Sequence, residues 1–207
     1  MADLENLVPV NPAGNADQIT RDYYDSLGFE ERIIGGVEPF TEAVLFGRTL
    51  STPVMTAALS HLSMIAEDGS VQTAMAMKRL GGMMWLGMCE DAELEAVTAT
   101  GANVVQIIKP YADLERVIHK IDQGKKYGCA ANGMDIDHAY RSDGTFGTDR
   151  DGIPVSTKSV EDIRRLVEAS EGLPFVVKGI LSVTDAERAV EAGAVGIVLS
   201  HHHGVFP

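Results

Sequence analysis

The sequence predicts a parallel α/β fold. Short apolar segments alternate along the chain with segments of helical periodicity, and most of the apolar segments are apolar at consecutive positions. That pattern is typical of parallel strands that are buried on both faces of a sheet and joined by helices. Capping residues at the ends of the helical segments support the same fold class.

Six strands are expected. Each except the last is followed by a stretch that can be read as helical, and the strands fall at residues 53–57, 83–86, 104–108, 130–136, 175–177 and 195–199. Their starts lie about 20 to 45 residues apart, which suits a doubly wound sheet and a (β/α)8 barrel equally well. Periodicity alone does not choose between these two architectures.

Two helices carry start and stop signals. Ser159 and Thr184 each stand three positions before a carboxylate, which is the spacing of an N-terminal capping box. Gly172 and Gly193 stand where the same helices are expected to end. We therefore predict helices that begin at these hydroxyl residues and end near these glycines.

The first 50 residues precede the strand–helix alternation. Residues 17–27 predict a helix, and residues 41–50 predict a short extended excursion with a turn at Gly47. Because no linker rich in Pro, Gly or Ser divides the chain, we expect an N-terminal segment at 1–50 followed by one α/β unit at 51–207.

Composition excludes several protein classes. The chain has 207 residues, 45% of them hydrophobic, with 17 basic and 30 acidic residues and a formal net charge of -13. This is enough for the core of one domain, and it excludes collagen-like, disordered and disulfide-stabilised chains. The excess of negative charge opposes binding to nucleic acid.

The sequence predicts neither a membrane span nor a disulfide. The longest uncharged stretches, 49–66 and 192–207, are interrupted by polar residues and fall short of the roughly 20 apolar residues that cross a bilayer. The N-terminus is acidic where a signal peptide would be basic, so we expect a cytoplasmic protein. Cys89 and Cys129 lack metal-site spacing and are expected to be reduced, buried thiols.

Charged residues follow two of the expected strands, at the end where parallel α/β folds bind ligands. Asp135 and Asp137 end the fourth strand and point the same way, so they are expected either to act in a site or to cap the next turn. Lys178 follows the fifth strand, where its ammonium needs an anion or water, and Gly179 permits close approach of a ligand. An ion pair between Lys178 and one of the aspartates is the alternative, and the two interpretations are compatible.

The last strand ends at Ser200 and continues into three histidines, His201, His202 and His203. Successive strand residues alternate faces, so at most two of these rings could reach one metal ion, and no second ligand cluster stands out. A purification tag is disfavoured because the histidines continue a strand and are followed by more chain. We therefore expect one catalytic imidazole, because a neutral histidine near a carboxylate is the most common general base.

Small residues end the first two strands. Ala57 and Ala58 would let the backbone lie against a flat ring, although small residues also pack ordinary turns. Gly87, at the end of the second strand, could face the same ligand.

In their order along the chain, these landmarks resemble the FMN-dependent α-hydroxy-acid oxidising enzymes, the family of glycolate oxidase, lactate oxidase and mandelate dehydrogenase. The resemblance runs from about residue 23 to residue 204. It is carried by VVKGIL at 176–181, DA at 185–186, AGAVGIVLS at 192–200, DID at 135–137 and TAA at 56–58. The SHHHG sequence at 200–204 departs from the better-known SNHGxR form. The resemblance implies a (β/α)8 TIM barrel.

It also implies roles for individual residues. His202 would be the general base, and Asp137 would orient its imidazole and stabilise the protonated form. Lys178 would lie beside the N1/O2 edge of the flavin, where negative charge develops on reduction. The turn at Ala57 and Ala58 would contact the flavin through its backbone.

Five more residues are assigned by the same resemblance. Gln106 would hydrogen-bond the pyrimidine edge of FMN, and Gly87 and Ser200 would also lie at the cofactor. Asp135 stands where the family usually has a threonine. Tyr23, with Tyr24 as a close rival, would bind the carboxylate of a small 2-hydroxy acid, which would lose two electrons and two protons to become a 2-oxo acid.

Two departures leave the substrate open. Ile108 stands where the best-known members have an active-site tyrosine, and Val205 stands where an arginine would bind the substrate carboxylate. A valine cannot replace a two-point charged contact.

Length is the other departure. A complete barrel takes roughly 250 residues, whereas about six strand–helix units are recognised here, so we expect a partial FMN-binding barrel at 51–207 that lacks two units. Its partner would be a complementing C-terminal segment or further copies in a homo-oligomer. The alternatives are an inactive truncated barrel or assembly fragment, and another FMN barrel such as a diphosphate-isomerase-type enzyme.

Overall fold

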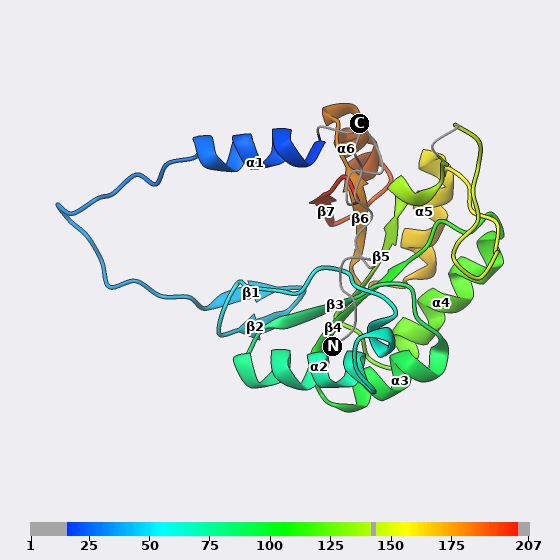
Figure 1. Cartoon of the computed structure of the whole chain (residues 1–207), viewed down its shortest axis with the longest axis horizontal. Coiled ribbons are helices and arrows are strands. Elements are labelled where there is room, and N and C mark those ends of the chain that lie inside the picture. Colours follow the sequence, from blue (N-terminus) through cyan, green and yellow to red (C-terminus); the bar gives the residue numbers. More distant parts are fainter. Residues whose placement is uncertain (1–15, 142–143, 203–207) are drawn as a thin grey trace.

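A computed structural model describes residues 16–141 and 144–202. Its centre is a five-stranded parallel sheet with the strand order β3-β4-β5-β6-β7 (Figure 1). The strands are β3 (Met83–Leu86), β4 (Asn103–Ile108), β5 (Ala131–Asp135), β6 (Phe175–Ile180) and β7 (Gly196–Leu199). Neighbours in the chain are neighbours in the sheet, which is the connectivity of a barrel wall, and the sheet forms about half of a (β/α) barrel.

Helices connect the strands and lie on the convex side of the sheet (Figure 1). They are α2 (Gly69–Leu80), α3 (Asp91–Ala99), α4 (Leu114–Lys126), α5 (Val160–Ala169) and α6 (Val183–Glu191), with short 3-10 turns η2 (Leu62–Met64) and η3 (Ile136–His138). The antiparallel hairpin of β1 (Ala43–Leu45) and β2 (Arg48–Leu50) packs on the concave side through the buried side chain of Leu50.

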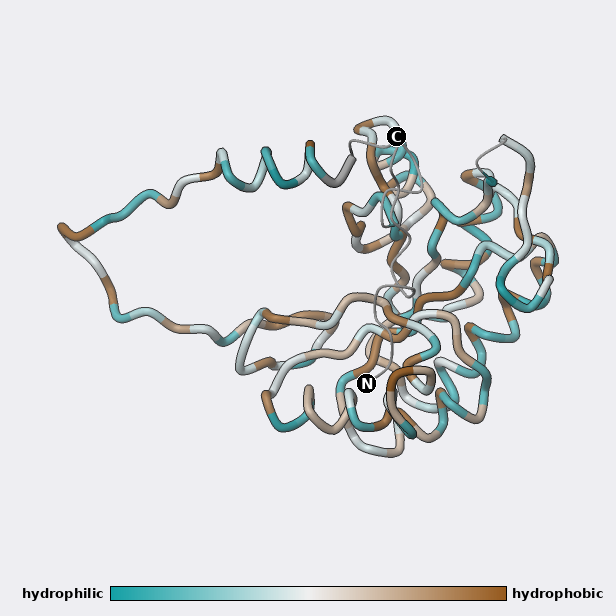
Figure 2. The backbone as a smooth tube through the Cα atoms, viewed as in Figure 1, coloured by the Kyte–Doolittle hydropathy of each residue, from teal (hydrophilic) through white to brown (hydrophobic). Residues whose placement is uncertain are grey.

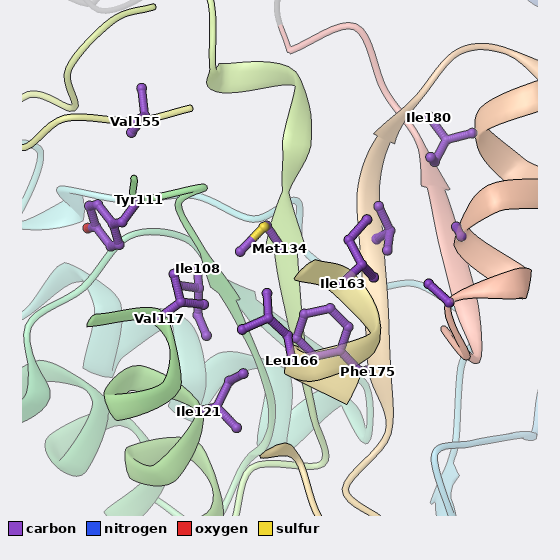
Figure 3. Close-up of a cluster of buried hydrophobic side chains, with 13 residues drawn as sticks. Ile108, Tyr111, Val117, Ile121, Met134, Val155, Ile163, Leu166, Phe175 and Ile180 are labelled. Atoms are coloured by element: carbon purple, nitrogen blue, oxygen red, sulfur yellow. The ribbon is translucent and has the colours of Figure 1, made fainter. Parts of the chain in front are cut away.

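The two faces of the sheet bury different cores. Met134 and Phe175 point outward and pack with Ile163 and Leu166 of α5, as Figure 3 shows. Strand residues of the other parity point inward and form the concave core with Leu50: Met83, Trp85, Val105, Ile107, Ala131 and Val176. Burial on both faces explains why the strands are apolar at consecutive positions, visible as brown segments in Figure 2.

The first expected strand, 53–57, forms only isolated contacts. Met55 makes a parallel bridge to Met83, and Leu59 makes another to Leu86. Pro53 has no N–H to donate, and within the described residues β3 is the one neighbour of this segment in the sheet. The segment is therefore an extended edge rather than a full strand.

The predicted helix ends are confirmed with one correction. Ser159 and Asp162 form a reciprocal capping box at the start of α5. Helix α6 begins two residues earlier than predicted, because Ser182, not Thr184, is the N-cap that accepts the hydrogen bond from the backbone N–H of Asp185. Gly193 follows α6 with a positive φ of 94°, as its stop role requires.

Helix α1 and the link that follows it lie away from the sheet (Figure 1). Helix α1 (Ala16–Ser26) confirms the helix predicted there, and Figure 1 shows an extended link from it to the β1–β2 hairpin. Apolar side chains in this link are exposed, and those of Phe29 and Ile34 are fully so. The hairpin turns at Phe46 and Gly47, both with positive φ, as predicted for Gly47.

Cys89 and Cys129 are buried free thiols, and burial raises the pKa of each to about 12. Within the described part of the chain, none of the helices has the length and apolar character needed to cross a membrane.

Helix α4 packs closely on β5 at Gly124, and this contact is testable. A Cβ at Gly124 would overlap the side-chain carboxamide of Asn132, so Gly124→Ala is expected to lower the free energy of unfolding by about 1–3 kcal/mol. At an open helical site the same change would stabilise the protein by up to about 1 kcal/mol. Urea titration measures the difference.

The matched control is the same substitution in an Asn132→Ala background, where the overlapping group is absent. There Gly124→Ala should cost nothing or stabilise the chain. A Gly124→Ala variant as stable as the unmodified chain would contradict this account of the packing between α4 and β5.

Candidate active site

A cluster of charged side chains lies at the carboxyl ends of the strands. Asp135 ends β5 directly beside Lys178 of β6, because these two residues are paired in the strand register. Asp137 follows in η3, Lys109 follows β4, and His202 follows β7. Four successive strand ends therefore supply the cluster, which is where parallel α/β folds hold their ligands.

His202 contacts both carboxylates through one ring nitrogen. Its Nδ1 lies 3.0 Å from Asp137 Oδ1 and 3.2 Å from Asp135 Oδ2. Since an ionised carboxylate can only accept, the proton of this nitrogen lies on Nδ1 and points to the carboxylates. The ring also stacks on His138, with 4.9 Å between the ring centroids.

Lys178 lies beside both aspartates and the imidazole. Its Nζ donates to Asp135 Oδ1 at 2.7 Å and lies 3.2 Å from His202 Nδ1. The pairing of β6 with β7 is irregular at the next residue, Gly179, which has a φ of +98°. A Cβ there would lie 2.6 Å from Asp137 Cγ, so only glycine lets β6 approach the second carboxylate this closely.

Lys109 also belongs to the cluster, and the sequence reasoning missed it. Its Nζ donates to Asp135 Oδ2 at 2.9 Å, and its side chain is mostly buried. The signal was available, because Lys109 follows an apolar strand directly, as Lys178 does. Asp135 thus forms ion pairs with two lysines, which confirms the expected ion pair of Lys178 with one of the aspartates.

The protonation states follow from these contacts. Burial raises the pKa of Asp135, but His202, Lys109 and Lys178 outweigh burial and hold that pKa well below its usual range. Burial and the neighbouring Asp135 raise the pKa of Asp137. Burial lowers the pKa of His202, whereas its two carboxylate partners raise it, and the net direction is upward.

The pKa of His138 is shifted in the opposite direction from that of His202. Burial, together with repulsion from Lys109 and His202, lowers the pKa of His138 to about 4. The stacked ring is therefore neutral at neutral pH and does not share the charge of its neighbour. The site pairs one imidazole that can accept a proton with one that does not.

A cavity of about 670 Å³ adjoins the cluster on the concave side. Four of the predicted cofactor residues line it: Ala57, Ala58, Lys178 and Ser200. Its walls are otherwise largely apolar and include Phe46 and Trp85. The side-chain hydroxyl of Thr56 accepts the backbone N–H of Trp85 at 2.8 Å and so ties the Ala57–Ala58 turn to β3.

Three predicted site residues, Gly87, Tyr23 and Gln106, do not line this cavity. Gly87 is buried against the backbone of the first segment, where a Cβ would lie 3.0 Å from Ala58 O, so its smallness serves this packing. Tyr23 lies on α1 and is 63% exposed, and its neighbour Tyr24 is equally exposed. Neither tyrosine lines the cavity.

Gln106 points to the helix side of the sheet. It shares a small cavity with Cys89, Tyr111 and Lys120, opposite the concave face that carries Lys178. Its strand neighbours Val105 and Ile107 point inward instead. Within the described residues, Gln106 therefore does not line the concave cavity beside Lys178, because the alternation of side chains along β4 directs it outward. Its contact with a flavin edge stays a prediction.

The same alternation of side chains along β4 places Ile108 in the outer core, where it is buried. The next residue, Lys109, points into the site. Val205 and His203 lie outside the described residues.

The charges of this cluster suit a proton on the imidazole better than a bound divalent metal ion. Asp135, Asp137 and His202 could each offer one ligand atom within 4.8 Å of the others. However, Lys109 and Lys178 already form ion pairs with Asp135, and two fixed ammonium groups would repel a metal cation.

Known proteins are similar to this chain in sequence and in fold. A 4-hydroxymandelate oxidase from Amycolatopsis orientalis is 27% identical over 199 residues, which cover 79% of this chain and 55% of the relative. An L-lactate oxidase from Lacticaseibacillus rhamnosus is 26% identical, covering 84% of this chain and 55% of the relative. Glycolate oxidase 3 from Arabidopsis thaliana is 26% identical, covering 92% and 62%. The chain thus spans about half the length of these relatives.

Solved structures are similar to this chain as well. A mandelate oxidase with benzoyl-formic acid superposes with a TM-score of 0.69 at 27% identity, covering 80% of this chain and 52% of that one. The family described as FMN-dependent dehydrogenase matches residues 13–154 and 153–205, nearly the whole chain. With its half-barrel and the cluster at its strand ends, the chain belongs to the FMN-dependent dehydrogenase family.

Proposed function

We propose that this chain carries the catalytic and flavin-facing residues of an enzyme that oxidises a small 2-hydroxy carboxylic acid to the 2-oxo acid with FMN. The contact of His202 Nδ1 with Asp137 at 3.0 Å, beside the Lys178 ammonium, carries the proposal. It joins a general base, the carboxylate that orients it and a fixed cation at one edge of the cavity.

The substrate class rests on the similar proteins. Their names state action on 4-hydroxymandelate, lactate and glycolate, all small 2-hydroxy acids. Oxidation converts the C2 hydroxyl to a carbonyl, which removes two protons and two electrons from the substrate.

The residues of the cavity fit the ring system of FMN. The Ala57–Ala58 turn has no bulky side chain, Phe46 and Trp85 provide apolar walls, and Lys178 places a cation at one edge. Lys178 is the one basic residue among the described residues that line the cavity, so the partners of a phosphate group are not in this set. When bound, FMN supplies the acceptor for the substrate's two electrons.

The protein's own groups handle the protons. We assign the proton of the substrate hydroxyl to His202 Nε2, because Nδ1 already faces Asp137 and Asp135. Asp137 then stabilises the imidazolium that forms, and the small residues of the 57–58 turn leave room for a planar ligand. We assign Ser200 and Lys178 to cofactor contact, and Tyr23 to the substrate only if α1 folds over the cavity.

A second segment is proposed to complete the site. Within the described residues β7 pairs only with β6, and its apolar side chains are exposed, with Leu199 at 76% and Ile197 at 40%. The chain also spans about half the length of its relatives. We propose that further strand–helix units of a longer protein, rather than a second copy of this chain, cover β7 and supply the phosphate contacts.

The cytoplasm stays the expected compartment, in keeping with two buried, unpaired cysteines.

Substitution at the base tests the proposed reaction. His202→Ala is expected to lower kcat by about 10²–10⁴-fold with lactate, glycolate or mandelate, because the hydroxyl proton loses its acceptor. Stopped-flow absorbance of the flavin in the FMN-supplemented protein measures the reduction. His119→Ala, on the exposed face of α4, is the matched control and should leave the rate unchanged.

Two results would contradict the proposal. One is a protein that binds no FMN even when the complementing segment is supplied. The other is a protein that binds FMN but shows no reduction by any 2-hydroxy acid, which would favour a partial barrel without turnover or a different FMN chemistry.

The pH profile tests the role of Asp137. Its carboxylate stabilises the protonated imidazole, so Asp137→Asn should lower the pKa of His202 and move the ascending limb of kcat/KM to lower pH. The plateau should also fall by at least about tenfold, because the ring is less well oriented. Asp122→Asn, a half-exposed position on α4, should leave both features in place, and a limb that moves to higher pH would refute the assignment.

Cofactor placement is testable without turnover. Ala58→Leu should fill the cavity and weaken FMN binding by at least about tenfold, measured as quenching of flavin fluorescence on titration. Ala96→Leu, an exposed position on α3, adds the same atoms elsewhere and should leave binding unchanged. Equal affinity in the two variants would place the flavin outside this cavity.

A further inference from the structure

Lys109 contacts the cluster, and the proposed reaction gives it no role. Its ammonium donates to Asp135 Oδ2 at 2.9 Å, and His202 Nδ1 lies 3.2 Å from the same oxygen. Both groups are therefore donors to one acceptor atom. The other oxygen of Asp135 accepts from Lys178.

We infer that Lys109 is a positioning residue that occupies Asp135 Oδ2, limits the hold of Asp135 on the imidazole and so directs the Nδ1–H of His202 to Asp137. The inference rests on the proposed function and deepens it. It explains the shorter of the two carboxylate contacts of His202, 3.0 Å to Asp137 against 3.2 Å to Asp135.

The surroundings of the imidazole support this role. Among the residues that the structure describes, the charged and titratable groups beside it include Asp135 and Asp137 from β5 and η3, Lys178 from β6, Lys109 after β4, and the stacked ring of His138. Without Lys109, two buried carboxylates would face one lysine and one imidazole. The imidazole would then be needed as a permanent cation to balance them.

A base that is permanently protonated cannot accept the substrate's proton. Lys109 supplies the second positive charge through its ion pair with Asp135, which leaves the imidazole free to cycle between its two forms. Repulsion from Lys109 acts in the same direction, because it lowers the pKa of His202 and of His138.

Imidazole titration followed by NMR in the unliganded 207-residue chain tests the inference. Lys109→Met keeps most of the side-chain volume and removes the charge, and it should raise the midpoint of His202 by at least about 0.5 pH unit. The midpoint of His138 should rise as well. Lys109→Arg keeps the charge and should restore the value of the unmodified chain.

Lys126→Met is the matched control, because it removes a lysine from the far end of α4 and should move neither midpoint. Near-UV circular dichroism checks that each variant is folded, and Lys109→Gln replaces Lys109→Met if that variant is not. An unchanged His202 midpoint in a folded, uncharged variant would overturn the inference, as would equal shifts in the Arg and Met variants.

The result separates this inference from the proposed reaction. A raised midpoint in Lys109→Met supports the positioning role even if no 2-hydroxy acid reduces FMN, in which case the proposed function alone fails. In an active, FMN-loaded protein the same variant should also move the ascending limb of kcat/KM to higher pH.

Discussion

Asp135 lies buried between two lysines, and the geometry of the site depends on this charge-compensated contact. A buried carboxylate without partners costs several kcal/mol, and removing one partner from a buried ion pair typically costs about 3–5 kcal/mol. Here the partners come from the ends of β4 and β6, on either side of the strand that carries Asp135. The same contact therefore ties three strands together at the edge where the imidazole approaches.

The parallel register makes that contact possible. Pairing of β5 with β6 sets Asp135 beside Lys178, and the alternation of side chains keeps both on the concave face. Gly179 then lets the backbone of β6 pass close to Asp137, so the second carboxylate reaches the imidazole without a steric conflict. The imidazole ring is held between two carboxylates, a lysine and the stacked ring of His138.

The half-barrel leaves this arrangement open on one side. Apolar side chains of β7 are exposed, and the cavity beside the cluster is lined by residues from the first segment, β6 and β7. Membership in the FMN-dependent dehydrogenase family accounts for this fold. The proposed completing units would cover the exposed strand and bury the apolar side of the cavity.

The sequence by itself determined the alternation of strands and helices, the capping box at Ser159 and the strand ends that carry Asp135, Asp137, Lys178 and His202. These features are local, since they depend on apolar runs, hydroxyl–carboxylate spacing and the residues that follow each run. Only the tertiary structure decided which side chains meet. Gln106 and Lys109 are three positions apart on one strand and its extension, so their side chains face opposite sides of the sheet. The packing of Val105 and Ile107 into the concave core decides which of the two faces that side. The edge position of residues 53–57 was likewise a tertiary result, because a strand forms fully only where a neighbour accepts its hydrogen bonds.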